Sequence, residues 1–350
     1  MAQMSKSKLG IYVCVFVAIL CSSPVALTYS ELGIVHLKMV DFFSLDSQQA
    51  WVLVQNNKDK TFLFRTNDGG NNWEALPTPF SLQNIFFVDP DNGWATAMEP
   101  NGEKFRFICL RTSDSGQSWS KLAYVGSSKE PSGIAFDTID HGWIVGEGES
   151  GRAFVYETND SGEHWNKLPW KSKPASGLYG VRLHGGIVYA WSSGAGGSGI
   201  FQLRPGMFPE QISALETMNF AFVSGDSIVS AGQLDVYLKD PTDGDWDEVL
   251  HARDMTFWDM KFADEEHGCV VGGEVYCTAD GGRTWEPRRL PRSAKGENEF
   301  FYRLYLLDSL HGWADGDDSI YETNDGAHTW SKVDFFDKDG KPLTHTRRIN

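Results

Sequence analysis

Short apolar runs recur along the chain, and each is followed by an acidic residue and a turn. Four of these runs are Ile85-Phe86-Phe87-Val88-Asp89, Ile134-Ala135-Phe136-Asp137, Met260-Lys261-Phe262-Ala263-Asp264 and Leu304-Tyr305-Leu306-Leu307-Asp308. Three of the turns lead into a Gly-Trp pair, namely Gly93-Trp94, Gly142-Trp143 and Gly312-Trp313. The equivalent pairs elsewhere are Ala50-Trp51 and Gly268-Cys269. Apolar runs this short, bounded by turn residues and lacking helical periodicity, predict β-strands.

A second element repeats five times with the pattern Thr-x-Asp-x-[Gly/Ala]-x-x-Trp. Asp folds a turn by bonding nearby main chain, and Gly accepts positive φ without a Cβ clash. Each copy follows an apolar run and ends on Trp, so we expect a hairpin whose second strand begins with a core side chain. These residues are predicted to be structural. The aspartates are Asp68, Asp114, Asp160, Asp280 and Asp325, and the tryptophans are Trp73, Trp119, Trp165, Trp285 and Trp330.

The spacing of the repeats predicts the architecture. Trp73, Trp119 and Trp165 are each 46 residues apart, and Trp285 and Trp330 are 45 apart. The 120 residues between Trp165 and Trp285 have room for two degenerate units. Seven units result, starting near residues 37, 81, 132, 177, 217, 255 and 300. Four short strands per unit predict an all-β fold, a seven-bladed β-propeller over residues 31–350 made of four-stranded antiparallel blades. How the ring closes is not evident from the repeats.

The repeated phrase resembles the Asp-box, or BNR, repeat of sialidases, sortilin-type receptors and xyloglucan-degrading propellers. The longer unit, Asp-x-x-x-Gly-Trp followed by the Asp box, looks most like the photosystem II stability/assembly factor family, which includes exported homologues. This resemblance covers about residues 37–335. It implies that the Asp-box turns are structural and lie on the face away from a sialidase-type active site.

Catalytic residues are not evident. A sialidase would need an arginine triad, an Arg-Ile-Pro string and a Tyr–Glu pair, but the nearest string is Leu203-Arg204-Pro205. Xyloglucan-degrading relatives place paired acids between two propellers, whereas this chain has one. Since its many aspartates can be assigned to turns, no catalytic carboxylate pair can be selected. We expect no enzyme activity, no cofactor and no metal; glycoside hydrolysis is the alternative if the protein is an enzyme.

The N-terminal segment is typical of an export signal. Lys6 and Lys8 precede an apolar run from Leu9 to Cys21, which is short for a membrane span. We expect residues 1–30 to be a signal peptide, with an uncleaved anchor as the alternative, and the protein to be periplasmic or secreted (in the thylakoid lumen if the source is photosynthetic). Without this segment the formal charge falls from −16 to −18, which disfavours nucleic-acid binding.

Two of the remaining cysteines are placed opposite each other by the repeat. Cys269 occupies the Trp position of the Gly-Trp pair, and Cys277 precedes the Asp-box Thr. Pairing Val271 with Val275 sets the two cysteines directly across neighbouring strands, about 4.5–5.5 Å apart. We predict a disulfide between them, which export permits, with two free thiols as the alternative. Cys109 is predicted to be a core thiol.

The surface opposite the Asp boxes carries the variable loops and the blade-to-blade connections. One connection is basic, with Arg288, Arg289 and Arg292, and is the candidate partner-binding site; a solvated loop is the alternative. The run from Asp315 to Asp318 is predicted to be a solvated turn, with weak calcium binding as the alternative.

Together these features favour an exported, monomeric, non-catalytic propeller that binds a protein partner. The family resemblance implies an assembly or stability factor for a membrane or envelope complex. The alternative is a carbohydrate-active or glycan-binding propeller. A receptor of the sortilin type would need more blades and a Cys-rich segment after the propeller.

Overall fold

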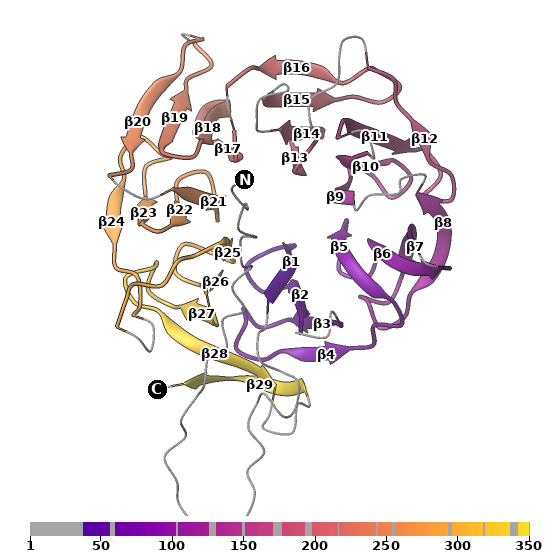
Figure 1. The fold of residues 1–350 in the computed structure, drawn as a ribbon, viewed down its shortest axis with the longest axis horizontal. Helices are drawn as coiled ribbons and strands as arrows, with labels where there is room; N and C mark the ends of the chain where they lie inside the picture. Colours follow the sequence, from indigo (N-terminus) through magenta and orange to yellow (C-terminus); the bar gives the residue numbers. More distant parts are fainter. Residues whose placement is uncertain are drawn as a thin grey trace, which may run out of the picture.

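The computed structural model shows seven antiparallel sheets arranged as blades around a central axis (Figure 1). It describes residues 38–56, 60–102, 104–125, 131–148, 151–170, 177–192, 198–215, 217–242, 244–253, 256–292, 296–317, 319–336 and 342–349. The predicted signal segment, residues 1–30, lies outside these. The prediction of a seven-bladed β-propeller with four-stranded blades is confirmed. Within the described ranges no helix is long and apolar enough to cross a membrane.

Each blade uses strands that are consecutive in the chain. Blade one contains β1 (Lys38–Ser44), β2 (Ala50–Gln55), β3 (Thr61–Thr66) and β4 (Glu74–Leu76). Blade two contains β5 (Ser81–Phe87), β6 (Gly93–Asn101), β7 (Lys104–Thr112) and β8 (Ser120–Val125). Blade three contains β9 (Pro131–Phe136), β10 (Gly142–Glu147), β11 (Ala153–Thr158) and β12 (Asn166–Lys167). Blade four contains β13 (Gly180–His184), β14 (Ile187–Ser192), β15 (Gly199–Leu203) and β16 (Glu210–Ser213).

The remaining blades follow the same order. Blade five contains β17 (Asn219–Val223), the 3-10 turn η1 (Ser224–Asp226), β18 (Ser227–Ala231), β19 (Asp235–Lys239) and β20 (Asp247–His251). Blade six contains β21 (Phe257–Phe262), β22 (Gly268–Gly272), β23 (Val275–Thr278) and β24 (Glu286–Arg288). Blade seven contains β25 (Arg303–Leu306), β26 (Gly312–Asp315), β27 (Ile320–Thr323), β28 (Ser331–Phe336) and a fifth strand, β29 (Pro342–Ile349). β29 pairs with β28 at the outer edge and also contacts β4 of blade one (Figure 1).

The hydrophobic core lies between the blades. The described residues form seven buried clusters, and each cluster joins two neighbouring blades. One of them joins blade seven to blade one, where the rings of Trp313 and Trp73 meet edge to face at 5.5 Å. The ring therefore closes by the same apolar packing that joins its other blades, since each face of a half-buried sheet must be covered.

The Asp boxes form the turns that the pattern predicts. In blade one the Thr66 hydroxyl donates to an Asp68 carboxylate oxygen at 2.9 Å and accepts from the Gly70 amide at 2.9 Å. The same two bonds recur at Thr112, Thr158, Thr278 and Thr323. The turn thus satisfies its own main-chain groups locally.

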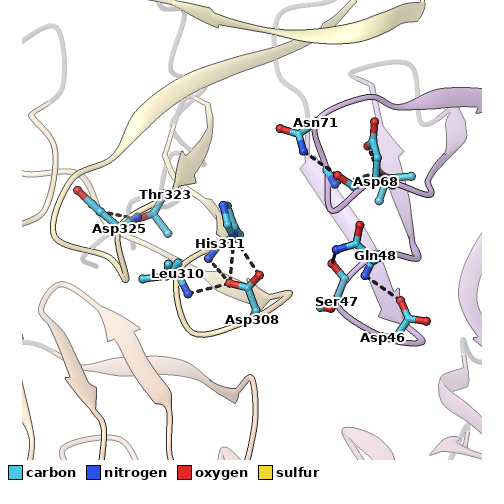
Figure 2. Close-up of polar contacts among 12 residues, drawn as sticks. Asp46, Ser47, Gln48, Asp68, Asn71, Asp308, Leu310, His311, Thr323 and Asp325 are labelled. Carbon is cyan, nitrogen blue, oxygen red and sulfur yellow. Dashed lines mark hydrogen bonds and ion pairs between the residues drawn. The ribbon is translucent and has the colours of Figure 1, made fainter.

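A second set of aspartate turns joins the first strand of a blade to its second on the same face. Asp46 accepts from the amides of Gln48 and Gln49, and Asp308 accepts from the His311 amide and ring (Figure 2). Strands that run back and forth place these turns and the Asp boxes together at one end of the blade. The loops between second and third strands and the blade connections therefore share the opposite face, called the connection face below.

Candidate partner-binding channel

The innermost strands of the seven blades enclose a cavity of about 2310 Å³ on the propeller axis. Its lining includes residues of β1, β5, β9, β13, β17, β21 and β25. Figure 1 shows these seven strands nearest the centre of the ring. Charged side chains reach into it from several of these strands. They include Asp41, Arg182, Asp259, Lys261 and Arg303, and Asp315 of the second strand β26 lines the cavity as well.

Two of the channel carboxylates link neighbouring blades. Asp41 accepts from the Ile85 amide of blade two at 2.8 Å, and Asp259 accepts from the Leu304 amide of blade seven at 3.0 Å. Each carboxylate follows a bulge in its strand, which turns the side chain toward the next blade. Burial raises the pKa of Asp41 to about 6, although the amides of Ile85 and Phe42 oppose the rise. Both carboxylates therefore hold neighbouring blades together.

Arg303 joins the last blade to the first. Its guanidinium donates to the main-chain carbonyls of Met39, at 3.4 Å, and of Val40. Asp315 lies directly across from Arg303 in the β25–β26 register and is buried. Burial raises the pKa of Asp315 to about 7, opposed by the charge of Arg303 and by the Met39 amide. Asp315 is therefore part of the ring closure, which corrects the prediction that it belongs to a solvated turn.

Two further cations in the channel are poorly compensated. The Lys261 ammonium lies 3.9 Å from an Asp259 carboxylate oxygen, which is long for an ion pair. The Arg182 guanidinium lies over the Phe220 ring at 5.8 Å and has no hydrogen-bond acceptor within the described part of the chain. Burial lowers the pKa of both groups, and Asp259 partly offsets that effect. Cations that are partly removed from water in this way favour a ligand with carbonyl or carboxylate oxygens.

The mouth of the channel on the connection face carries exposed aromatic side chains. Trp258 is 48% exposed, Tyr302 39%, Tyr179 54% and Phe105 57%. All four line the channel. Exposed aromatic groups beside polar ones are characteristic of protein interaction surfaces.

The three arginines of the predicted partner site lie in two different environments. Arg288 ends β24, is half-buried, and forms an ion pair with Glu286 at 3.0 Å. Arg289 and Arg292 are exposed on the connection that follows, and the Arg292 guanidinium donates to the Gly296 carbonyl at 3.2 Å. Arg289 and Arg292 remain available to a partner, whereas Arg288 is engaged in the blade itself.

The two paired cysteines lie in a groove between blades six and seven. Val271 pairs with Val275 and Cys269 with Cys277, and the two sulfur atoms form a disulfide. The disulfide packs beside Ala327 of the blade-seven Asp box. Cys109 is a free thiol buried between blades two and three, and burial raises its pKa to about 12. These groups stabilise blades and are not placed for chemistry in the channel.

Residues 238–346 match the model of the family described as Photosynthesis system II assembly factor YCF48. The resemblance to the YCF48 family is confirmed. No curated protein matches the chain.

Among solved structures, YCF48 bound to a D1 peptide is 21% identical, with a TM-score of 0.61, and the match covers 83% of this chain and 94% of that one. YCF48 from Cyanidioschyzon merolae is 18% identical, with a TM-score of 0.57, over 83% of this chain and 96% of that one. The GH74 enzyme of Niastella koreensis is 13% identical, with a TM-score of 0.65, over 89% of this chain but 55% of that one. At these identities the likeness shows a shared propeller fold.

The sequence did not reveal the channel residues as a group. Asp41, Asp259 and Arg303 lie in different blades and meet only because the ring closes. A detectable signal was present, since Asp41 and Asp259 each interrupt an apolar first strand. A charged residue in such a strand has to be compensated by a neighbour.

Proposed function

We propose that this protein is a non-catalytic assembly or stability factor that binds an extended segment of a protein partner at the connection-face mouth of its channel. The observation that supports this most directly is the combination of undercompensated Arg182 and Lys261 within the channel and exposed aromatic side chains around its mouth. Main-chain carbonyls and acidic side chains of a peptide would compensate the cations, while its apolar side chains would cover the aromatic rings.

The family match supports the same proposal. One structure similar in fold is YCF48 bound to a D1 peptide, so a propeller of this kind has room for a peptide ligand. Arg289 and Arg292 lie on the connection that leads toward the mouth and are proposed to contact acidic groups of the partner.

An affinity pull-down from the envelope fraction of the native host tests the proposal. Two variants probe the site: Arg182→Gln/Lys261→Gln in the channel and Arg289→Ala/Arg292→Ala on the connection. The control is Arg283→Ala/Lys167→Ala, which removes two exposed positive charges elsewhere, Arg283 being in the Asp box of blade six. We expect wild type and control to retain a membrane-protein complex, the channel variant to retain at least about tenfold less, and the connection variant to show a smaller loss.

Two results would contradict the proposal. If all four proteins retain the same complex, the partner binds somewhere other than the channel mouth. If none retains a complex and the wild type instead hydrolyses xyloglucan or binds a glycan array, the carbohydrate alternative replaces the assembly role. Solvent-exposed pairs alone contribute little to binding, so the channel variant is the more decisive of the two.

We infer that the protein is exported and acts as a monomer. The charged start and apolar run of residues 1–30 support export. N-terminal sequencing of the protein isolated from its host should give a start downstream of Met1, and light scattering should give a mass close to that of one chain.

A further inference from the structure

The channel mouth between blades six and seven carries a compact cluster of three aromatic rings. Trp258 meets Phe300 at 6.0 Å and Tyr302 at 5.7 Å, both edge to face, and Phe300 lies 4.9 Å from Tyr302. The bulge between Phe257 and Asp259 leaves Trp258 out of the pairing with β22, so its indole stands at the surface. The Trp258 side chain is 48% exposed, so part of its aromatic surface is accessible to a ligand.

Acidic groups surround this aromatic cluster. Asp317 accepts hydrogen bonds from the Tyr302 hydroxyl at 2.8 Å and from the Phe300 amide at 3.3 Å. The Asp317 amide donates to one carboxylate oxygen of Glu299 at 3.2 Å. Glu299 is 1% exposed, and its other carboxylate oxygen has no hydrogen-bond donor among the residues the structure describes.

The local field at the cluster is negative. Burial, the hydrogen bond to Asp317 and the charges of Asp317, Asp315 and Glu299 raise the pKa of Tyr302 to about 12. A buried carboxylate oxygen without a donor is costly, and a nearby cation reduces that cost. Open aromatic faces beside carboxylates attract a cation through both the ring quadrupole and direct charge.

We propose that Trp258, Tyr302 and Asp317 form a binding site for a basic side chain of the partner's segment, with arginine preferred over lysine. Asp317 supplies the acceptor oxygens, Glu299 adds buried negative charge behind it, and the Trp258 indole supplies a flat face. A planar guanidinium can stack on the indole while it donates to the carboxylate, which an ammonium does less well. The inference rests on the proposed function only in taking the ligand to be part of a protein.

The test uses the full protein and small probes. Protein labelled with nitrogen-15 at tryptophan is titrated with N-acetyl-arginine amide and, separately, with N-acetyl-citrulline amide, which has nearly the same shape and no charge. The Trp258 indole signal is assigned by its absence in Trp258→Phe. We expect the arginine probe to shift this signal with a Kd at least about tenfold lower than that of the citrulline probe.

A charge-removing variant locates the site. Asp317→Asn keeps one oxygen acceptor and removes the charge, so it should strongly reduce the preference for the arginine probe over the citrulline probe. The matched control is Glu210→Gln, which removes one exposed charge from β16 of blade four and should leave the preference intact. Equal binding of both probes by wild type would overturn the proposal, and so would an undiminished preference in Asp317→Asn. The wild-type comparison does not depend on Asp317→Asn, so it decides the matter even if that variant fails to fold.

The two proposals can fail independently. Arginine-selective binding without any captured complex would leave the basic-side-chain site standing and count against the assembly role. A captured complex with no arginine preference would support the assembly role and count against the basic-side-chain site.

Discussion

The indole of Trp94, in the second strand of blade two, donates a hydrogen bond of 2.7 Å to the Ser161 carbonyl in the Asp box of blade three. Trp51 of blade one makes the equivalent bond to Ser115 of blade two at 2.9 Å. In blades one and two the second-strand tryptophan is therefore coupled to the Asp box of the next blade. The two halves of the repeat occur together because they meet across a blade interface.

The first prediction concerns this coupling. Trp94→Phe should lower the free energy of unfolding by about 1 kcal/mol more than Trp143→Phe, because it also loses a buried hydrogen bond. Trp143 is the matched control: it is equally buried, but its indole nitrogen has no acceptor within the described residues. Denaturant unfolding measures both variants, and equal losses would show that the indole bond adds nothing to stability.

The second prediction concerns the Asp-box turn. Thr112 donates to Asp114 at 2.8 Å and accepts from the buried Gly116 amide at 2.9 Å. Thr112→Val keeps the shape and leaves the buried Gly116 amide without its acceptor, so the free energy of unfolding should fall by about 2 kcal/mol. Thr242→Val removes an exposed hydroxyl that bonds Asp240 and should cost under about 0.5 kcal/mol. Thermal or chemical unfolding compares the two, and a similar cost for both would contradict a structural role for the Asp box.

The third prediction concerns the Cys269–Cys277 disulfide. It closes a short loop, with a sequence separation of 8, so reduction should lower the free energy of unfolding by about 2–3 kcal/mol. The double variant Cys269→Ala/Cys277→Ala should show that loss permanently and be insensitive to reductant. Alkylation of the unreduced, unfolded protein should modify Cys109 and neither of the paired cysteines. Modification of all three would mean that the thiols are free.

The fourth prediction concerns pH. Folding raises the pKa of Asp315 to about 7, so between about pH 4 and pH 7 the folded state binds more protons than the unfolded state. The contribution of Asp315 to the free energy of unfolding therefore falls as the pH rises through that window, and it falls no further above about pH 7. Asp315→Asn should remove most of the loss, about 1–3 kcal/mol between pH 5 and pH 8.

Unfolding of wild type and variant at pH 5 and pH 8 measures this effect. Asp41, whose pKa burial raises to about 6, should leave a smaller dependence of the same sign in the variant. The pH dependence from Asp114 has the opposite sign. Hydrogen bonding by Ser118 outweighs burial and lowers the pKa of Asp114, so its contribution to stability is lost in acid. A parallel pH profile for wild type and Asp315→Asn would contradict the assignment.

The sequence by itself determined the fold class and the blade-building turns. The Thr112–Asp114–Gly116 bonds join residues at most four apart, so local chemistry alone specifies them. The Cys269–Cys277 register was also predictable, since a tight hairpin sets which residues face each other. Short-range order of this kind does not depend on how the rest of the chain folds.

Only the tertiary structure decided the channel and its chemistry. Asp41 and Ile85 are 44 residues apart, and Arg303 reaches Val40 across almost the whole chain, so these contacts exist only once the ring closes. The repeat pattern specifies each blade because its bonds are local, whereas side chains on the axis take their partners from other blades, and the pattern of one blade carries no information about them.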